Sequence, residues 1–136
     1  MRKTVLAVIM TLCAAGAHAE DTRPYSVIDC GKFTTQMDLN KCAVDNLKSA
    51  DKALNEAYQA LTAKQVEAAS KQRLKAAQRA WIAFRDRECA FEVGPQEGGG
   101  TIWPMENSGC LEEITATRIR TLKQLRNCMP IACPAH

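Results

Sequence analysis

Chemistry in this chain could come from its acidic residues, its cysteines and one glycine-rich run. Its two histidines, His18 and His136, lie near the ends of the sequence, where neither can serve as a central general base or metal ligand. The run Gly98-Gly99-Gly100-Thr101 lacks the Gly-Lys-Ser/Thr of a phosphate loop and follows no strand pattern. We therefore expect neither phosphate binding nor histidine-dependent nucleophilic catalysis.

Carboxylates and thiols offer two further kinds of site. Glu88 and Glu92 share a face of an expected helix, an arrangement that glycoside hydrolysis could use, but exposed helix acids are common and usually solvated. A zinc site would need closely spaced thiols, and the sequence contains no CxxC pair. We expect a protein that is not an enzyme and that binds no cofactor and no metal.

The first 19 residues have the features of an export signal. Arg2 and Lys3 precede an apolar run over 5–15, and Ala17-His18-Ala19 fits the small-x-small pattern that signal peptidase cleaves. We expect cleavage after Ala19 and a periplasmic or secreted product, because the run is shorter than the 20 or so residues of a membrane span. Residues 20–136 then carry 16 basic and 15 acidic side chains, a balance of +1, which argues against a nucleic-acid partner.

The exported chain keeps an even number of cysteines, which in an oxidising compartment indicates three disulfides. Fifteen pairings are formally available. We expect the sequence-adjacent pairing, because each pair joins segments that a short helical fold brings together. The predicted bonds are Cys30 with Cys42, Cys89 with Cys110, and Cys128 with Cys133.

Hydrophobic periodicity predicts three helices and no strand. A capping box at Thr35-Gln36-Met37-Asp38 starts a helix that runs to about residue 62, and a second helix covers about 64–91. Gly94-Pro95 ends the second helix and opens a loop through Ser108 that we expect not to be helical, with Asn107 or Ser108 capping a third helix to about residue 127. The apolar residues expected to face inward are Met37, Val44, Leu47, Leu54, Tyr58 and Leu61 in the first helix, Val66, Leu74, Ala77, Trp81 and Phe84 in the second, and Leu111, Ile114, Leu122 and Leu125 in the third.

One domain of this size is most economically an antiparallel three-helix bundle stapled by disulfides. Residues 20–33 form an irregular arm tied to the first helix through Cys30, and a Cys-bounded tail follows the third helix. Arg118 falls on the inward side of the third helix, where it would need an acid such as Asp86 or Asp38. The sequence leaves the oligomeric state open.

Charge is unevenly spread in a way that suggests a binding surface. Residues 86–113 hold seven acids and one base, whereas residues 64–85 hold six bases and one acid. In an antiparallel bundle, the end of the second helix, the long loop and the start of the third helix lie together, so this tip should be acidic. Trp103 in the loop is either an interface anchor or a plug for the end of the bundle. The candidate binding residues are Glu92, Glu97, Thr101, Trp103 and Glu106.

Several motifs together resemble a known family. They are Thr35-Gln36-Met37-Asp38 with Cys30 and Cys42, Trp81-Ile82-Ala83-Phe84-Arg85-Asp86 with Cys89, and Cys110-Leu111 with Thr115 and Arg118. The chain is similar, over roughly 30–125, to the lysozyme inhibitor LprI-like N-terminal domain family, whose members are small exported bacterial helical domains. The resemblance implies a single such domain over 20–136, and the tail bounded by Cys128 and Cys133 is an addition to the family pattern.

Two functions fit these features. In the first, the acidic tip enters the cleft of a basic c-type lysozyme and keeps peptidoglycan from its catalytic carboxylates. In the second, the same tip belongs to a generic envelope interaction module that binds another envelope protein and does not inhibit lysozyme. In neither does the chain span the membrane.

Overall fold

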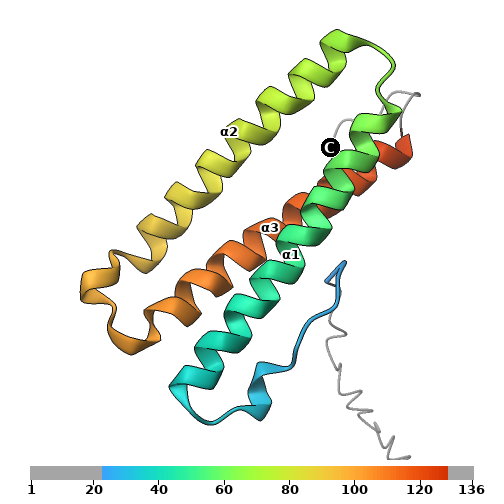
Figure 1. Ribbon diagram of the computed structural model, residues 1–136. Helices are drawn as coiled ribbons and strands as arrows, with labels where there is room; N and C mark the ends of the chain where they lie inside the picture. Colours follow the sequence, from blue (N-terminus) through green and yellow to red (C-terminus); the bar gives the residue numbers. More distant parts are fainter. Residues whose placement is uncertain (1–22, 129–136) are drawn as a thin grey trace, which may run out of the picture.

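The computed structural model describes residues 23–128 of the 136, and this part of the chain contains three long helices and no strand. The helices are α1 (Gln36–Lys64), α2 (Ala68–Val93) and α3 (Trp103–Cys128), with short 3-10 turns η1 (Cys30–Lys32), η2 (Gln96–Gly98) and η3 (Gly100–Ile102). Consecutive helices run in opposite directions, so the α2–α3 loop lies at the same end of the bundle as the start of α1 (Figure 1). The predicted antiparallel three-helix fold is confirmed.

Local chemistry explains where the helices begin and end. The Thr35 hydroxyl accepts a hydrogen bond from the Asp38 backbone N–H at 3.2 Å and donates to the Asp38 carboxylate at 2.6 Å, which confirms the predicted cap. Gly94 ends α2 with φ at 76°, a backbone conformation that suits glycine, and its N–H donates to the Ala90 carbonyl.

The start of α3 differs from the expectation. The helix begins at Trp103 rather than after Asn107 or Ser108, so the second half of the expected loop is helical and Ser108 is buried inside α3. Pro104 does not prevent this, because the backbone N–H groups of the first helical turn have no acceptor within the helix and proline lacks only that group. The α2–α3 connection is therefore shorter than predicted, and two 3-10 turns fill it.

The core lies mainly between α1 and α3, which share the most extensive helix contact, while α2 packs less extensively against α3. Its fully buried cluster consists of Leu54, Ala57, Leu61, Ile119 and Leu122. Partly buried side chains pack around it, and α2 contributes only Leu74 and Trp81 to that layer. Helix α2 thus covers one edge of the core and leaves much of its own surface in water.

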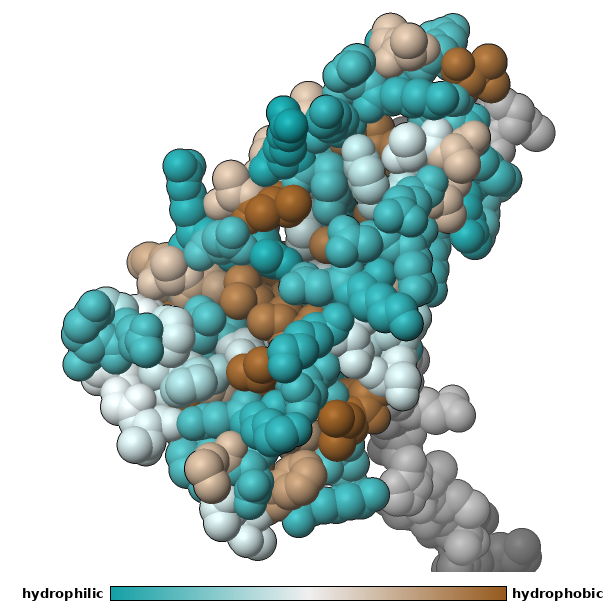
Figure 2. All heavy atoms as spheres, in the orientation of Figure 1, coloured by the Kyte–Doolittle hydropathy of each residue, from teal (hydrophilic) through white to brown (hydrophobic). Residues whose placement is uncertain are grey.

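Four residues that were expected to face inward are exposed instead: Met37, Val66, Ala77 and Phe84. Val66 lies in the short α1–α2 turn, and Met37 lies in the first turn of α1, beyond the end of the core. Ala77 and Phe84 are exposed because α2 packs less extensively than the other two helices. Figure 2 shows separate hydrophobic side chains along the middle of one face of the molecule, between hydrophilic ones.

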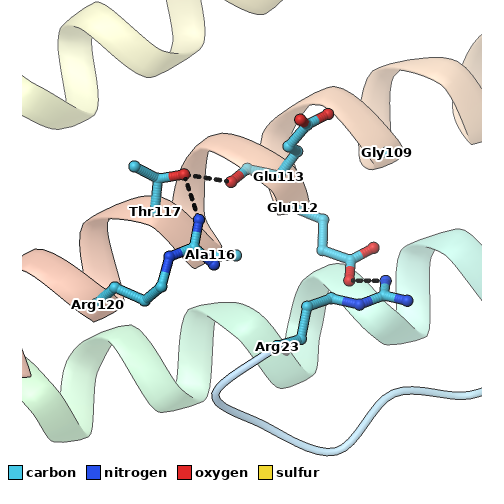
Figure 3. A pocket seen from close by; sticks show the side chains of 7 residues that line it. All are labelled: Arg23, Gly109, Glu112, Glu113, Ala116, Thr117 and Arg120. Atoms are coloured by element: carbon cyan, nitrogen blue, oxygen red, sulfur yellow. Dashed lines mark hydrogen bonds and ion pairs between the residues drawn. The ribbon is translucent and has the colours of Figure 1, made fainter. Parts of the chain in front are cut away.

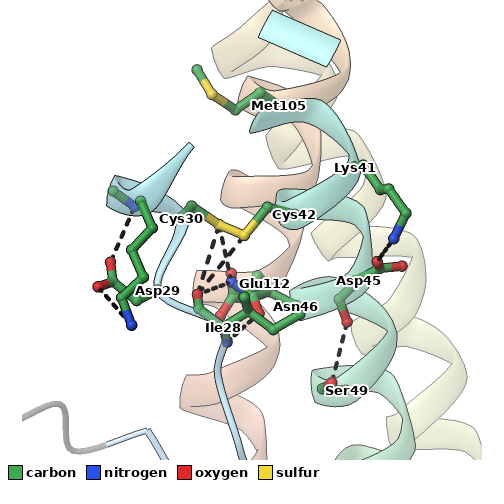
Figure 4. The surroundings of a disulfide bond; sticks show 12 residues. Ile28, Asp29, Cys30, Lys41, Cys42, Asp45, Asn46, Ser49, Met105 and Glu112 are labelled. Atoms are coloured by element: carbon green, nitrogen blue, oxygen red, sulfur yellow. Dashed lines mark hydrogen bonds and ion pairs between the residues drawn. A yellow bond between two sulfur atoms is a disulfide. The ribbon is translucent and has the colours of Figure 1, made fainter. Parts of the chain in front are cut away.

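The segment before α1 is held against the bundle, as predicted for the arm. Cys30 and Cys42 form a disulfide with an S–S distance of 2.02 Å. Beside it, the Asn46 side chain accepts from the Ile28 N–H at 2.7 Å and donates to the Ile28 carbonyl at 3.0 Å (Figure 4). Asn46 is buried, and this pair of bonds satisfies its amide with the arm's own backbone.

Candidate functional site

The five candidate binding residues all lie at one end of the bundle. Glu92 is near the end of α2, Glu97 lies in η2, Thr101 in η3, and Trp103 and Glu106 in the first turn of α3. Helix α1 also begins at this end (Figure 1). We call this end the acidic tip and define it by the exposed residues Glu92, Glu97, Thr101, Ile102 and Glu106.

A disulfide fixes the base of the acidic tip. Cys89 and Cys110 are bonded at 2.05 Å with their Cα atoms 5.7 Å apart, which confirms the second predicted pairing. The bond joins α2 to α3 just below the loop, and Glu92 Oε2 lies 3.1 Å from Cys110 Sγ. Both ends of the loop are thereby tied to one covalent link. For the third predicted pairing, Cys128 is disulfide-bonded but Cys133 lies outside the described residues, so this pairing stays a prediction.

Trp103 braces the loop from within. Its indole N–H donates to the Gly94 carbonyl at 3.0 Å, and its side chain is half-buried. The ring lies so close to Gly99 that this position has no room for a Cβ atom. Of the two predicted roles for Trp103, the contacts favour the plug over the free anchor.

Two polar residues of α1, to which the sequence analysis gave no role at the loop, attach the loop to the rest of the fold. The Asn40 amide donates to the Thr101 carbonyl at 2.8 Å, and the Gln36 amide donates to Asn40 Oδ1 at 2.8 Å. Helical periodicity could not reveal this role, because the partner is a loop carbonyl 61 positions away. Thr101 is thus held in place by its backbone while its side chain faces solvent.

The acids near the tip have different surroundings. Glu92, Glu97 and Glu106 are exposed and form no ion pair with any residue in the described range 23–128. Glu112 is buried, and its Oε1 accepts from Arg23 at 2.8 Å and from the Tyr25 hydroxyl at 2.9 Å. The surface charge of the acidic tip therefore comes from the three free carboxylates and not from Glu112.

The Arg23–Glu112 pair borders a hollow of about 520 Å³ on the side of α3 that faces the arm (Figure 3). Groups of both charges line it, and Arg120 donates to the Thr117 hydroxyl at 2.9 Å. Such a mixed lining gives no preference for an anion or a cation. The lining residues are Arg23, Gly109, Glu112, Glu113, Ala116, Thr117 and Arg120.

A second polar cluster lies where α2 meets α1 and α3. Arg85 donates to Asp51 at 3.0 Å and to the buried Thr115 hydroxyl at 3.2 Å. The guanidinium groups of Arg85 and Arg118 lie 5.5 and 5.7 Å from the centre of the Trp81 ring. These contacts attach α2 to both other helices.

The expectation that an acid accompanies Arg118 is wrong. Its Nε donates to the Gln78 side-chain oxygen at 3.1 Å, and no described carboxylate pairs with it. Because burial disfavours the charged guanidinium, the pKa of Arg118 is lowered from its usual value. Gln78 is buried and belongs to the face of α2 that meets α3. Because glutamine is uncharged, the expectation of an acidic partner for Arg118 did not include it.

Two other pKa shifts lie on the exposed face of α1. Hydrogen bonds from Lys41 at 2.6 Å and Lys48 at 3.0 Å lower the pKa of Asp45. The bond between Lys41 and Asp45 (Figure 4) also raises the pKa of Lys41. These are surface ion pairs within one helix. They support α1 and are not part of the acidic tip.

Neither a metal centre nor a membrane span is found in the part of the chain that the structure describes. No group of three or more histidine, cysteine or acidic side chains there is arranged to hold a metal ion. None of the three described helices is long and apolar enough to cross a bilayer. The arrangement at the acidic tip offers charge, exposed polar groups and rigidity, which are properties of a binding surface.

Comparison with known proteins assigns the family. The family described as lysozyme inhibitor LprI matches residues 30–122. The chain belongs to the lysozyme inhibitor LprI family. The match includes both described disulfides and the whole α2–α3 loop.

Individual relatives agree with this assignment. An uncharacterized protein of Rhizobium meliloti, R02472, is 38% identical over 129 residues, covering 86% of this chain and 89% of its own length. Lipoprotein LprI of Mycobacterium bovis is 32% identical over 117 residues, covering 85% of this chain and 51% of its own, and the Mycobacterium tuberculosis protein of the same name gives the same values. The chain therefore spans about half the length of the mycobacterial proteins. No solved structure matches.

The motifs behind the LprI resemblance occupy two structural positions. Thr35 caps α1 beside the acidic tip, while Trp81, Arg85, Thr115 and Arg118 form the polar cluster that attaches α2. Both sets support the helices rather than present groups at the acidic tip. The LprI motifs therefore lie in the scaffold and not among the exposed residues of the acidic tip.

Proposed function

We propose that this protein is an exported lysozyme inhibitor that binds a c-type lysozyme through the acidic tip and acts by occlusion, not by catalysis. The observation that carries the proposal is the set of exposed carboxylates of Glu92, Glu97 and Glu106, free of ion pairs within residues 23–128, on the α2–α3 loop and the two helix ends that the Cys89–Cys110 disulfide ties together. Membership in a family named for lysozyme inhibition supports it.

Charge and rigidity both favour this mode of binding. Carboxylates that are not neutralised by internal ion pairs attract a cationic enzyme and speed its encounter with the acidic tip. A loop held by Trp103, Asn40 and a disulfide loses little conformational freedom on binding. Ile102, 39% exposed between Thr101 and the braced Trp103, supplies an apolar contact among the acids.

Export is part of the proposal, because lysozyme acts on the cell wall outside the cytoplasm. Residues 1–19, with the predicted signal peptide and the cut after Ala19, lie outside the described residues. Two disulfides within residues 30–110 support an oxidising destination such as the periplasm or the exterior.

The test is a cell-wall lysis assay with the oxidised exported chain and a c-type lysozyme. The double variant Glu97→Gln/Glu106→Gln removes two tip charges, and Glu56→Gln/Glu67→Gln removes two exposed charges elsewhere as a matched control. We expect the tip variant to raise the inhibition constant at low salt by about tenfold, because each lost charge contact weakens steering and binding, and the control to leave it nearly unchanged. Added salt should reduce that difference.

Two results would contradict the proposal. Equal effects of the tip and control variants would move the binding surface away from the acidic tip. No inhibition by the wild-type chain with its disulfides intact would favour the envelope interaction module, and recovery of a single periplasmic partner by the immobilised protein would then support that alternative.

A further inference from the structure

One flank of α2 carries exposed residues at coiled-coil spacing. Six residues between positions 73 and 91 follow one another at intervals of four, three, four, three and four, and all six are exposed. Two are phenylalanines: Phe84 is 54% exposed and Phe91 is 85% exposed. Alternating intervals of three and four place side chains on one stripe of a helix, the arrangement by which one helix packs along another. We call this stripe the α2 seam; it consists of Arg73, Ala77, Ala80, Phe84, Arg87 and Phe91.

An apolar hollow of about 280 Å³ lies beside the N-terminal half of the α2 seam. Leu61 of α1, Leu74 and Ala77 of α2, and Leu125 of α3 form its apolar lining, and its polar lining residues are Gln65, Ser70 and Arg73. The three helices leave this space open because α2 packs less extensively than α1 and α3. A hollow of this size accommodates an aromatic side chain, and its lining matches one chemically.

We propose that a second copy of this chain docks on the α2 seam in antiparallel orientation, so that Phe91 of each copy enters the hollow of the other. The α2 seam is self-complementary about a point between Ala80 and Phe84. In this register Phe84 faces the small Ala80 of the other copy, and Phe91 faces Arg73 at the edge of the hollow. Contacts of this reciprocal kind generate a closed two-fold dimer.

The charges of α2 favour the antiparallel orientation. The first half of the helix exposes four bases and no acid between Lys71 and Arg79, whereas residues 86–92 carry three acids and one base. Antiparallel pairing places each basic half beside an acidic half, and parallel pairing would place like charges together. The bases are Lys71, Arg73, Lys75 and Arg79, and the acids are Asp86, Glu88 and Glu92.

The contact is long enough for a stable interface. Residues 73–91 span about 28 Å of helix at the usual rise per residue, and two helices packed over that length, with an aromatic ring buried at each end, approach the size of a specific interface. The dimer leaves Glu97, Thr101 and Glu106 of the acidic tip free, because they follow the end of α2, whereas Glu92 lies in α2 beside Phe91 and borders the contact. The inference therefore does not rest on the proposed lysozyme inhibition.

The test measures the mass of the oxidised chain by sedimentation equilibrium over a range of concentrations. We compare the wild type with Phe84→Ser and Phe91→Ser, and use Val66→Ser as the matched control, since Val66 is 95% exposed in the α1–α2 turn and away from the α2 seam. All three positions are exposed, so circular dichroism should show unchanged folding. We expect a wild-type dimer whose dissociation constant rises by about tenfold or more in each phenylalanine variant, because each loses a buried aromatic contact, and by less than about twofold in the control.

The same samples decide against the inference in two ways. A wild-type chain that remains monomeric up to about 100 µM, which places any dissociation constant well above that concentration, would overturn it. A dimer that is indifferent to both phenylalanine substitutions would overturn the α2 seam as its interface. Lysozyme inhibition by Phe84→Ser, about two helical turns before Glu92, should equal that of the wild type, and this readout keeps failure of the dimer distinct from failure of the inhibitor proposal.

Discussion

The α1–α3 pair and helix α2 belong to one fold but are held by different kinds of contact. Helix α1 buries seven residues and α3 buries six, whereas α2, of similar length, buries only Gln78 and Cys89. Hydrophobic burial joins α1 to α3 along their length. Helix α2 is attached at a disulfide near the acidic tip and at the polar cluster around Arg85 and Trp81.

This difference means that one part of the molecule provides most of the stability, while another part keeps most of its surface exposed. A helix fixed at a few points opens locally at lower free-energy cost than one packed along its whole length. It also keeps apolar side chains available for another molecule, as Phe84 and Phe91 show. The α1–α3 pair, together with the arm, supplies the stability, whereas α2 and the loop present the two surfaces that we propose to bind other molecules.

The largest effect should come from the same substitution made in each region. Leu122 is fully buried between α1 and α3. Leu122→Ala should lower the unfolding free energy by about 3 to 4 kcal/mol, because the substitution leaves a cavity that the packed helices cannot close. Leu74→Ala on half-buried α2 should cost about 1 kcal/mol, since less surface is removed from contact. Urea unfolding followed by circular dichroism measures both. Equal losses would mean that α2 contributes as much to the core as α3 does.

The two disulfides whose cysteines both lie within the described residues provide the next comparison. Removing either one, as Cys89→Ala/Cys110→Ala or Cys30→Ala/Cys42→Ala, should lower the unfolding free energy by about 3 kcal/mol, because each closes a loop of comparable length. Hydrogen exchange should separate them. Loss of Cys89–Cys110 should speed exchange in the second half of α2 and leave α1 protected, whereas loss of Cys30–Cys42 should release the arm alone. Unchanged protection of α2 in the first variant would contradict the attachment described here.

Elements governed by neighbouring residues were predictable from the sequence. The Thr35 cap, the end of α2 at Gly94 and both described disulfides follow from short-range chemistry or from adjacent cysteines. The inward face of α2 was predicted less well. The side of α2 that faces the other helices contains the buried Gln78 and the partly buried Arg85, which hydrophobic periodicity does not count, while the apolar Ala77 and Phe84 lie on the adjacent exposed flank.

The acidic tip was predictable to a similar degree. Exposure of Glu97 and Glu106 follows from their charge. The burial of Glu112 does not, because its partners Arg23 and Tyr25 come from the arm, 89 and 87 positions earlier. Asn40 and Trp103 act through loop carbonyls, whose positions exist only once the chain is folded.

The smallest predicted effect tests the polar attachment of α2. Arg85→Gln should lower the unfolding free energy by about 1 kcal/mol, because it removes the bonds to Asp51 and Thr115. The loss stays small because the two carboxylates that pair with Arg85, those of Asp51 and Asp86, are partly solvated. Arg79→Gln, at an exposed position of the same helix, should have almost no effect and serves as the control. Arg85→Lys should recover less than half of the loss, since an ammonium lacks the planar, forked guanidinium that bonds both partners and stacks on Trp81. If glutamine at position 85 left both the unfolding free energy and the exchange of α2 amides unchanged, α2 would be held by the disulfide and its few apolar contacts alone, and the polar cluster would have no part in keeping the acidic tip in place.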